Sequence, residues 1–191
     1  YFWILWTLFL PFLTDARSIL TLWLGTIPPE AAQFTSLTLL CFLVDFTPGT
    51  LNILEQAHGQ IRRYYLYTSL TAVMAFVITY MAYRLGAPAR AGYLAFIGCY
   101  LLKAVVMLRI AHQDTGLPVG AYWKKALVPA FTPGLLTLLI IEALTCVIPE
   151  VWWRFFLMAA LSALLMALFI WRIGLTEGEK AFVRSKLPWL P

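Results

Sequence analysis

Six long apolar segments occupy almost the whole of this 191-residue chain. The hydrocarbon core of a bilayer is about 30 Å thick, and a helix needs about 20 apolar residues to cross it. Charged residues make up 12% of the chain, against about 25% in soluble domains. A single soluble core of this size could not bury so much apolar surface. We therefore predict an all-α membrane protein, a bundle of about six transmembrane helices.

Breaks in the apolar pattern give the ends of these helices. Pro29 starts the second segment, and Gly59 closes the turn after it. Pro129 and Pro133 interrupt the fifth segment and indicate either a hinge or a fixed kink. The predicted spans are residues 1–24, 29–56, 62–85, 88–112, 123–148 and 151–173, with a cytoplasmic tail at 174–191.

Two spacings near the end of the chain predict local structure. Ala159, Ala163 and Ala167 follow one another at four-residue intervals in the sixth segment, and small residues at this spacing let helices approach closely. Thr176 and Glu179 have the spacing of a capping box. The tail is therefore expected to contain a short helix.

The basic residues indicate orientation rather than nucleic-acid binding, because they are scattered over the loops and do not gather on one face. The formal net charge is +5. The side of the membrane with more Lys and Arg in its loops is usually cytoplasmic. Arg84, Arg90 and Arg154 fall on one side, and the predicted cytoplasmic side holds Arg62, Arg63, Arg109, Lys124, Lys125, Arg172, Lys180, Arg184 and Lys186.

The cysteines do not predict a disulfide framework or a metal site. Cys41, Cys99 and Cys146 all fall inside apolar segments, are odd in number and lack metal-ligand spacing. We expect small core residues at these positions and neither a metal nor a cofactor. The chain begins inside an apolar segment without an initiator Met, and we expect it to be part of a longer protein.

Three short motifs carry a family resemblance. Residues 20–28, L-T-L-W-L-G-T-I-P, match the pattern L-x-L-W-L-G-x-x-P, and residues 174–180 resemble a G-L-T-x-x-E-R ending. Residues 55–62 resemble a Q-A-x-G-K-I-K turn, although His58 replaces a small Thr and Gln60 a basic residue. In this order, the motifs resemble those of bacterial polysaccharide and O-antigen flippases, in the multidrug/oligosaccharidyl-lipid/polysaccharide exporter superfamily. The positions matched in the cytoplasmic turn include Ala57, Gly59, Arg62 and Arg63.

The resemblance implies two six-helix lobes that face each other across a cavity and alternate between inward-open and outward-open states. This chain would be the C-terminal lobe, with the N-terminal lobe of the same protein as its partner. The implied substrate is an oligosaccharide linked to undecaprenyl pyrophosphate, moved across the bacterial cytoplasmic membrane for surface polysaccharide export. Such a protein is a multi-pass transporter in contact with membrane lipid. It is not an enzyme.

Two cations inside the predicted spans are candidates for binding the substrate diphosphate. An ionisable group at a helix centre costs at least about 2.5 kcal/mol, so it usually faces protein or a wet cavity. Lys103 lies at the centre of the fourth span and could bind phosphate as a point charge. Its alternative is snorkelling or a pair with a neighbouring helix. Arg17 could bind phosphate with its forked guanidinium or serve as an interfacial anchor.

The acidic residues allow similar pairs of interpretations. Asp45, close to Pro48, Gly49 and Asn52, could bind a coupling proton or sodium ion at a broken helix, or could simply bond to a neighbouring helix. Asn52 and Glu55 are expected to shape the cytoplasmic turn, with Glu55 near the headgroups. Asp15 is expected to be an interfacial residue that faces away from Arg17. Glu142 is expected to be either a partner of Lys103 or an interfacial residue.

Three other functions compete with the flippase. A cation-coupled multidrug exporter of the same superfamily would use Asp45 and Glu142. A membrane-embedded enzyme of polysaccharide biosynthesis would need a large loop or clustered carboxylates, whereas the longest loop, residues 113–122, contains only Asp114. A purely structural subunit would hold Lys103 and Asp45 in buried pairs with no route to water.

Overall fold

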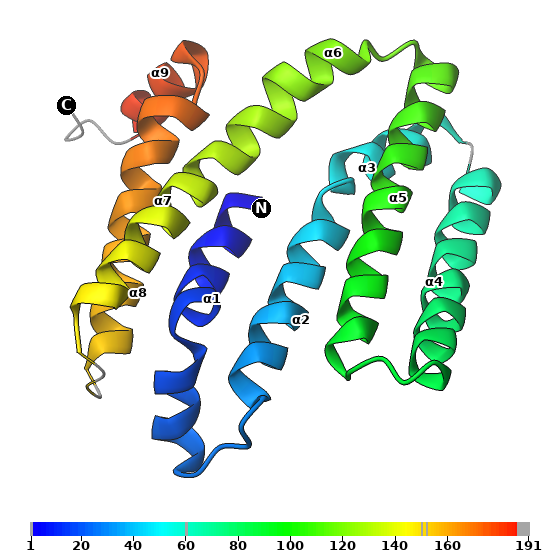
Figure 1. Ribbon diagram of the computed structural model, residues 1–191. Coiled ribbons are helices and arrows are strands. Elements are labelled where there is room, and N and C mark those ends of the chain that lie inside the picture. The colour runs from blue at the N-terminus through cyan, green and yellow to red at the C-terminus, as the bar shows by residue number, and fades with distance from the viewer. Residues whose placement is uncertain (1, 60, 150, 152, 187–191) are drawn as a thin grey trace. The chain divides into compact units, whose positions relative to one another are not determined.

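The computed structural model describes residues 2–59, 61–149, 151 and 153–186. Figure 1 shows helices joined by short connections, and the described residues contain no β-strand. Six of the helical segments in this described part are long and apolar enough to cross a membrane. The prediction of an all-α membrane protein with six spanning helices is confirmed.

Contacts between helices divide the chain into two compact units. Unit 1 comprises Tyr1–Pro28 and Ala121–Pro191, and unit 2 comprises Pro29–Gly120. Each unit therefore contains three of the six spans. Unit 1 is made of two segments distant in sequence, whereas unit 2 is continuous.

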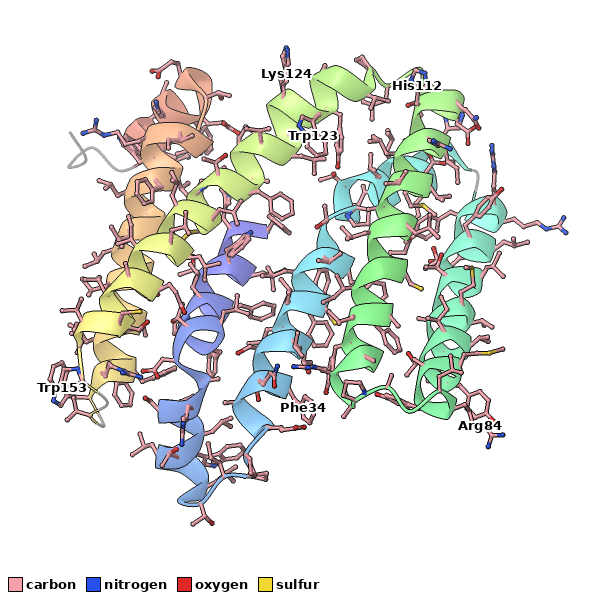
Figure 2. All side chains as sticks on the ribbon, in the orientation of Figure 1. Phe34, Arg84, His112, Trp123, Lys124 and Trp153 are labelled. Atoms are coloured by element: carbon pink, nitrogen blue, oxygen red, sulfur yellow. The ribbon has the colours of Figure 1, made fainter. Side chains whose placement is uncertain are left out.

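Unit 2 is built around one long helix, α5, which packs against the other three helices of the unit. In Figure 2, His112 near the end of α5 and Arg84 at the end of α4 mark opposite ends of the unit. The helices of unit 2 are α2 (Ala31–Phe46), α3 (Gly49–His58), α4 (Ile61–Arg84) and α5 (Arg90–Thr115).

The second span is broken as predicted, because α2 ends at Phe46 and α3 begins at Gly49. Pro48 has no N–H to donate to the preceding turn. The Val44 carbonyl, four residues before Pro48, accepts from the Thr47 N–H at 3.2 Å, and the Thr47 hydroxyl donates to the Leu43 carbonyl at 3.0 Å. At the other end of α3, Gly59 has a φ of +86°, a left-handed conformation that glycine adopts without steric strain.

Unit 1 packs α1, α7 and α8 against one another. In Figure 2, Lys124 and Trp153 mark opposite ends of this unit. Its elements are α1 (Phe2–Leu24), the second half of α6 (Val119–Tyr122), the π-helix η1 (Trp123–Leu127), α7 (Val128–Val147), α8 (Arg154–Phe169), the π-helix η2 (Ile170–Gly174) and α9 (Glu177–Lys186).

The fifth span remains helical through both of its prolines, running from Val119 to Val147. Pro133 cannot donate to the Pro129 carbonyl four residues earlier. The indole N–H of Trp3, on α1, donates to that carbonyl at 3.3 Å. Close packing supports this contact, because a Cβ added to Gly134 would overlap the indole of Trp6.

Two of the three alanines spaced along α8, Ala163 and Ala167, do not lie on its buried side, contrary to the simplest expectation from their spacing. Ala163 and Ala167 are exposed, whereas Met158, Ser162 and Met166 are fully buried. The buried side of α8 therefore carries long, flexible methionine side chains, which can fill irregular gaps between helices.

The tail contains the short helix α9, and the predicted capping contact is present. One carboxylate oxygen of Glu179 accepts hydrogen bonds from the Thr176 N–H at 2.8 Å and from the Thr176 hydroxyl at 2.7 Å. These two hydrogen bonds favour the ionised carboxylate and lower the pKa of Glu179 below its ordinary value.

Candidate functional site

A buried lysine in unit 2 forms an ion pair with a partly exposed carboxylate. Lys103, at the midpoint of α5, is 7% exposed and pairs with Asp45 on α2. Its ammonium also lies 5.1 Å from the centre of the Tyr100 ring. Of the interpretations considered for Lys103, the structure shows the pair with a neighbouring helix. The same pair shows Asp45 bonded to a neighbouring helix.

The two partners differ in accessibility. The Lys103 side chain is 9% exposed and the Asp45 side chain 32%. The pair is therefore accessible from the surface of unit 2 on the side of the Asp45 carboxylate. An anion arriving there would compete with Asp45 for the ammonium, and a cation would compete with Lys103 for the carboxylate.

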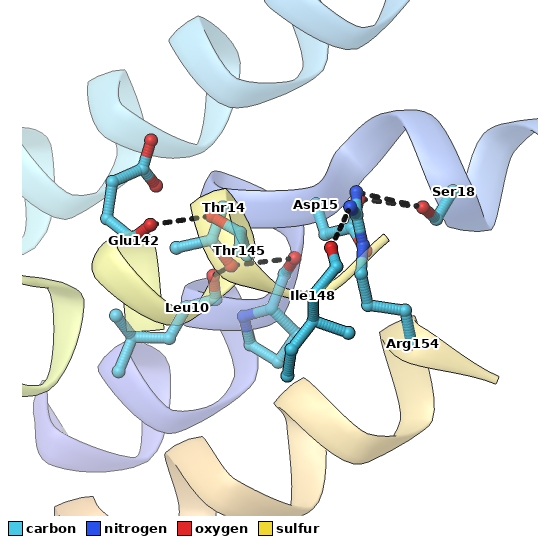
Figure 3. A network of polar contacts seen from close by, with 9 residues as sticks. Leu10, Thr14, Asp15, Ser18, Glu142, Thr145, Ile148 and Arg154 are labelled. Carbon is cyan, nitrogen blue, oxygen red and sulfur yellow. Dashed lines mark hydrogen bonds and ion pairs between the residues drawn. The ribbon is translucent and has the colours of Figure 1, made fainter. Parts of the chain in front are cut away.

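A second buried pair holds unit 1 together, and it corrects the expectation that Asp15 is an interfacial residue. Asp15 is 3% exposed and Arg154 is 6% exposed. The Arg154 guanidinium binds both carboxylate oxygens, with Nε to Oδ2 at 2.9 Å and Nη2 to Oδ1 at 2.6 Å. Figure 3 shows this contact joining α1 to the start of α8. Arg154, considered in the sequence only as a charge on the side opposite the cytoplasmic one, is thus a structural partner of a buried carboxylate.

Further hydrogen bonds satisfy the remaining groups of this pair. The Ser18 hydroxyl donates to Asp15 Oδ1 at 2.7 Å, and Arg154 Nη1 donates to the Ile148 carbonyl at 3.2 Å (Figure 3). A buried ion pair is tolerated when such bonds replace its lost hydration. We interpret this pair as structural.

A kink in α1 allows Asp15 to reach Arg154. Asp15 has a non-helical backbone, with φ −140° and ψ 40°, four residues after Pro11. The Thr14 hydroxyl donates to the Leu10 carbonyl at 3.0 Å and lies 3.4 Å from the Pro11 carbonyl. The first span is therefore kinked at Asp15. Arg17, two residues later, is exposed and does not lie at a buried pair.

The residues at the helix break are buried or partly buried, whereas those of the turn predicted to be cytoplasmic are exposed. Pro48 is buried and Gly49 partly buried, while Ala57, Gly59 and Arg62 are exposed. Gln60, one of the departures from the family pattern, lies outside the described residues.

Arg63 ties the start of α4 to the end of α5. Its Nη1 donates to Asp114 Oδ1 at 3.1 Å, and its Nη2 donates to Gln113 at 3.0 Å. The Arg63 side chain is 41% exposed and that of Asp114 is 14% exposed. Arg63 therefore orients a carboxylate that is itself mostly buried.

Glu55 is fully buried, which corrects the expectation that it lies near the headgroups. Neither of its carboxylate oxygens has a hydrogen-bond partner among the described residues. Asn52, one turn earlier on the same face of α3, is partly buried. Sequence reasoning missed this arrangement, although the three-residue spacing of two polar residues within an apolar span was a visible signal.

Glu142 does not form the pair with Lys103 that was one of its two expected roles. Glu142 on α7 is exposed, and the partner of Lys103 is Asp45.

A pocket of about 210 Å³ in unit 2 is lined by Glu30, Gln33, Pro88, Ala89 and Arg90, at the end where α2 and α5 begin.

The cysteines are free, with Cys41 and Cys99 buried and Cys146 exposed. Within the described ranges, no group of three or more His, Cys, Asp or Glu residues could hold a metal ion.

No protein-family model, curated protein or solved structure matches this chain. Its helices define a multi-pass membrane protein.

Proposed function

We propose that this chain is the C-terminal lobe of a transporter that flips a lipid-linked oligosaccharide across the cytoplasmic membrane by alternating access. Three sequence motifs and six apolar helices support the proposal. No covalent bond is made or broken in such a reaction. The protein has only to shield a charged and sugar-bearing headgroup from the hydrocarbon core.

The observation that carries the proposal is the Lys103–Asp45 pair, in which a buried ammonium meets a partly exposed carboxylate. The Asp45 side chain is 32% exposed, whereas the Asp15 side chain of the structural pair is 2% exposed, so the Lys103–Asp45 pair is the one that can exchange partners with a substrate. Lys103 lies near the centre of its helix, where a diphosphate crossing the membrane needs a counter-charge.

The geometry favours exchange of partners at Lys103. Its ammonium has three donors and no acceptor. Asp45 neutralises it when no substrate is bound, and its partly exposed carboxylate is on the side from which a diphosphate would approach. Replacement of Asp45 by a substrate phosphate would keep the ammonium paired throughout the cycle. This avoids the cost of an isolated buried charge.

The proposed orientation places the C-terminus in the cytoplasm. The excess of Lys and Arg falls on the side of the turn at Arg62 and Arg63 and of the tail. In a bacterial cell, a fluorescent protein that folds only in the cytoplasm should fluoresce when fused to the C-terminus. Fluorescence from a reporter that matures only outside the cytoplasm would contradict this orientation.

A double variant separates transport from simple packing. Lys103→Met alone leaves Asp45 unpaired, and Asp45→Ala alone leaves Lys103 unpaired, so either single change can impair folding. The pair Lys103→Met with Asp45→Ala removes both charges. In a strain that lacks the chromosomal gene, the full-length double variant should reach the membrane at normal levels but export at least tenfold less glycan.

The Asp15–Arg154 pair provides the matched control. If it is structural, Asp15→Ala combined with Arg154→Met should retain surface glycan export in proportion to the amount of folded protein. Normal export by the Lys103→Met and Asp45→Ala double variant would exclude the Lys103–Asp45 pair from transport. Impaired export of cationic drugs with normal glycan export would favour a multidrug exporter.

A further inference from the structure

The pocket at the starts of α2 and α5 brings opposite charges into one small cavity of about 210 Å³. Glu30 and Gln33 line it from the start of α2, and Pro88, Ala89 and Arg90 line it from the start of α5. The side chains of Glu30, Gln33 and Arg90 are exposed. The pocket therefore offers a carboxylate, an amide and a guanidinium to a ligand that arrives from outside unit 2.

The length of α5 places this pocket at the level of the lipid headgroups. α5 has 26 residues and is one of the six candidate membrane spans. At a rise of 1.5 Å per residue it is about 39 Å long, whereas the hydrocarbon core is about 30 Å thick. The ends of such a helix extend into the headgroup region. A pocket beside its first residue therefore faces the headgroups of phospholipids.

Arg90 lies where a helix disfavours a cation. It is the first residue of α5, and the N-terminus of a helix carries partial positive charge. No carboxylate among the described residues forms an ion pair with Arg90. Arg84, on the other side of the same turn, lies instead in the last turn of α4, where a cation is favoured. An anion in the pocket would therefore supply the counter-charge that Arg90 lacks.

Glu30 restricts the pocket to a ligand that also carries positive charge. Its carboxylate, like the Arg90 guanidinium, forms no ion pair with another described residue. An ionised carboxylate repels a ligand that is only anionic. It can accept hydrogen bonds from a primary ammonium, as can the amide oxygen of Gln33, whereas a quaternary ammonium has no N–H to donate. A ligand with one phosphate and one primary ammonium therefore satisfies both charges of the pocket.

Neighbouring side chains hold the walls of the pocket in place. The Tyr83 hydroxyl donates to the Ala89 carbonyl at 2.8 Å, and a Cβ added to Gly92 would overlap the same hydroxyl. Across the pocket, the rings of Phe34 and Tyr93 stack with their centres 5.5 Å apart and join α2 to α5. Figure 2 labels Phe34 near the start of α2. A pocket formed in advance loses less conformational freedom when a ligand binds.

We propose that this pocket binds the headgroup of a phospholipid that carries phosphoethanolamine. Arg90 binds the phosphate, and Glu30 and Gln33 accept hydrogen bonds from the ammonium. The acyl chains of the lipid stay in the bilayer beside the spans. This inference concerns lipid binding and does not rest on the proposed function.

The test is equilibrium binding of a short-chain phosphatidylethanolamine, labelled in its ethanolamine group, to the purified full-length protein in detergent. We expect saturable binding that short-chain phosphatidylcholine and phosphatidylglycerol compete for at least tenfold less well than unlabelled phosphatidylethanolamine. Arg90→Gln should weaken binding at least tenfold, since it removes the positive charge that binds the phosphate. Arg84→Gln is the matched control, because it neutralises an exposed arginine outside the pocket, and it should bind like the wild type.

Glu30→Gln tests the contact with the ammonium. It should weaken binding of phosphatidylethanolamine at least fivefold without weakening competition by phosphatidylglycerol, which has no ammonium. Glu142→Gln neutralises an exposed carboxylate on another span and should bind like the wild type. Because Glu30 and Arg90 are both exposed, their variants should elute as a single species like the wild type.

Four results would overturn the proposal. They are the absence of saturable binding to the wild type, equal competition by phosphatidylcholine or phosphatidylglycerol, and wild-type binding by folded Arg90→Gln or Glu30→Gln protein. The fourth is equal competition by soluble glycerophosphoethanolamine or inorganic phosphate, which would assign the pocket to a soluble ligand rather than to a lipid.

Discussion

Trp3 donates its indole N–H to the carbonyl of Pro129, which Pro133 leaves without its usual helical donor. The distance between the Trp3 nitrogen and the Pro129 oxygen is 3.3 Å. A proline inside a helix removes one backbone hydrogen bond, and in a membrane the freed carbonyl cannot turn to water. A side chain from α1 thus completes the backbone hydrogen bonding of α7.

Removing this donor should destabilise unit 1 only while Pro133 is present. Trp3→Phe keeps an aromatic ring and loses the N–H, so we expect it to lower the free energy of unfolding by about 1 kcal/mol. In a Pro133→Ala background, the new backbone N–H can serve Pro129, and the same change should cost less. Unfolding in mixed micelles would measure this double-mutant cycle. Equal costs in both backgrounds would contradict the role of Trp3.

One-sided disruption of the Asp15–Arg154 pair should be severe. Asp15→Asn leaves the buried guanidinium without its counter-charge, and breaking such a pair costs about 3–5 kcal/mol. Thermal unfolding of the purified protein measures the loss. The neighbouring exposed residue gives the control, since Arg17→Ala should change stability by no more than about 0.5 kcal/mol. Similar effects of the two substitutions would argue against a buried pair.

Gly134 should tolerate no side chain, because an added Cβ would overlap the Trp6 indole. We expect Gly134→Ala to destabilise unit 1 by about 1–3 kcal/mol through overpacking. Gly98, on α5, has no atom within 4 Å of its added Cβ. Gly98→Ala should therefore leave stability unchanged or raise it, as helix propensity predicts. Denaturation curves that rank the two variants in the opposite order would disprove this packing.

The cap of α9 should weaken in acid. Hydrogen bonds from Thr176 lower the pKa of Glu179 below its ordinary value of 4.5. A carboxyl with a lower pKa in the folded state stabilises that state above its unfolded-state pKa, and the effect is lost as pH falls through the folded value. Amide exchange in residues 177–180 should therefore become less protected below about pH 4. Glu179→Gln should remove this pH dependence, and an unchanged dependence would contradict the cap.

Local sequence patterns were sufficient to predict the membrane spans and the positions where their helices are interrupted. The apolar segments predicted six spanning helices, and the structure has them. The break at Pro48, the left-handed Gly59 and the cap at Thr176 also followed from residues next to one another in the chain. Each depends on backbone hydrogen bonding within a few residues, which the identities of those residues already constrain.

Local sequence patterns could not predict contacts between residues that are distant in the chain. Asp15 and Arg154 are 139 positions apart, and Asp15 alone was compatible with an interfacial position. The position of Glu55 near Arg62 and Arg63 in the sequence predicted that it lies near the lipid headgroups, yet it is buried. Burial depends on which helix covers each face, and the apolar segments carry apolar residues on nearly every face.

The sequence by itself determined that this chain crosses a membrane six times and where its helices break, because hydrophobic length and missing backbone donors act locally. Only the tertiary structure decided which charges meet: Asp45 with Lys103, and Asp15 with Arg154. The physical reason is that an ion pair in hydrocarbon is fixed by helix packing, and the partners of a buried charge are chosen by the fold rather than by their spacing in the chain.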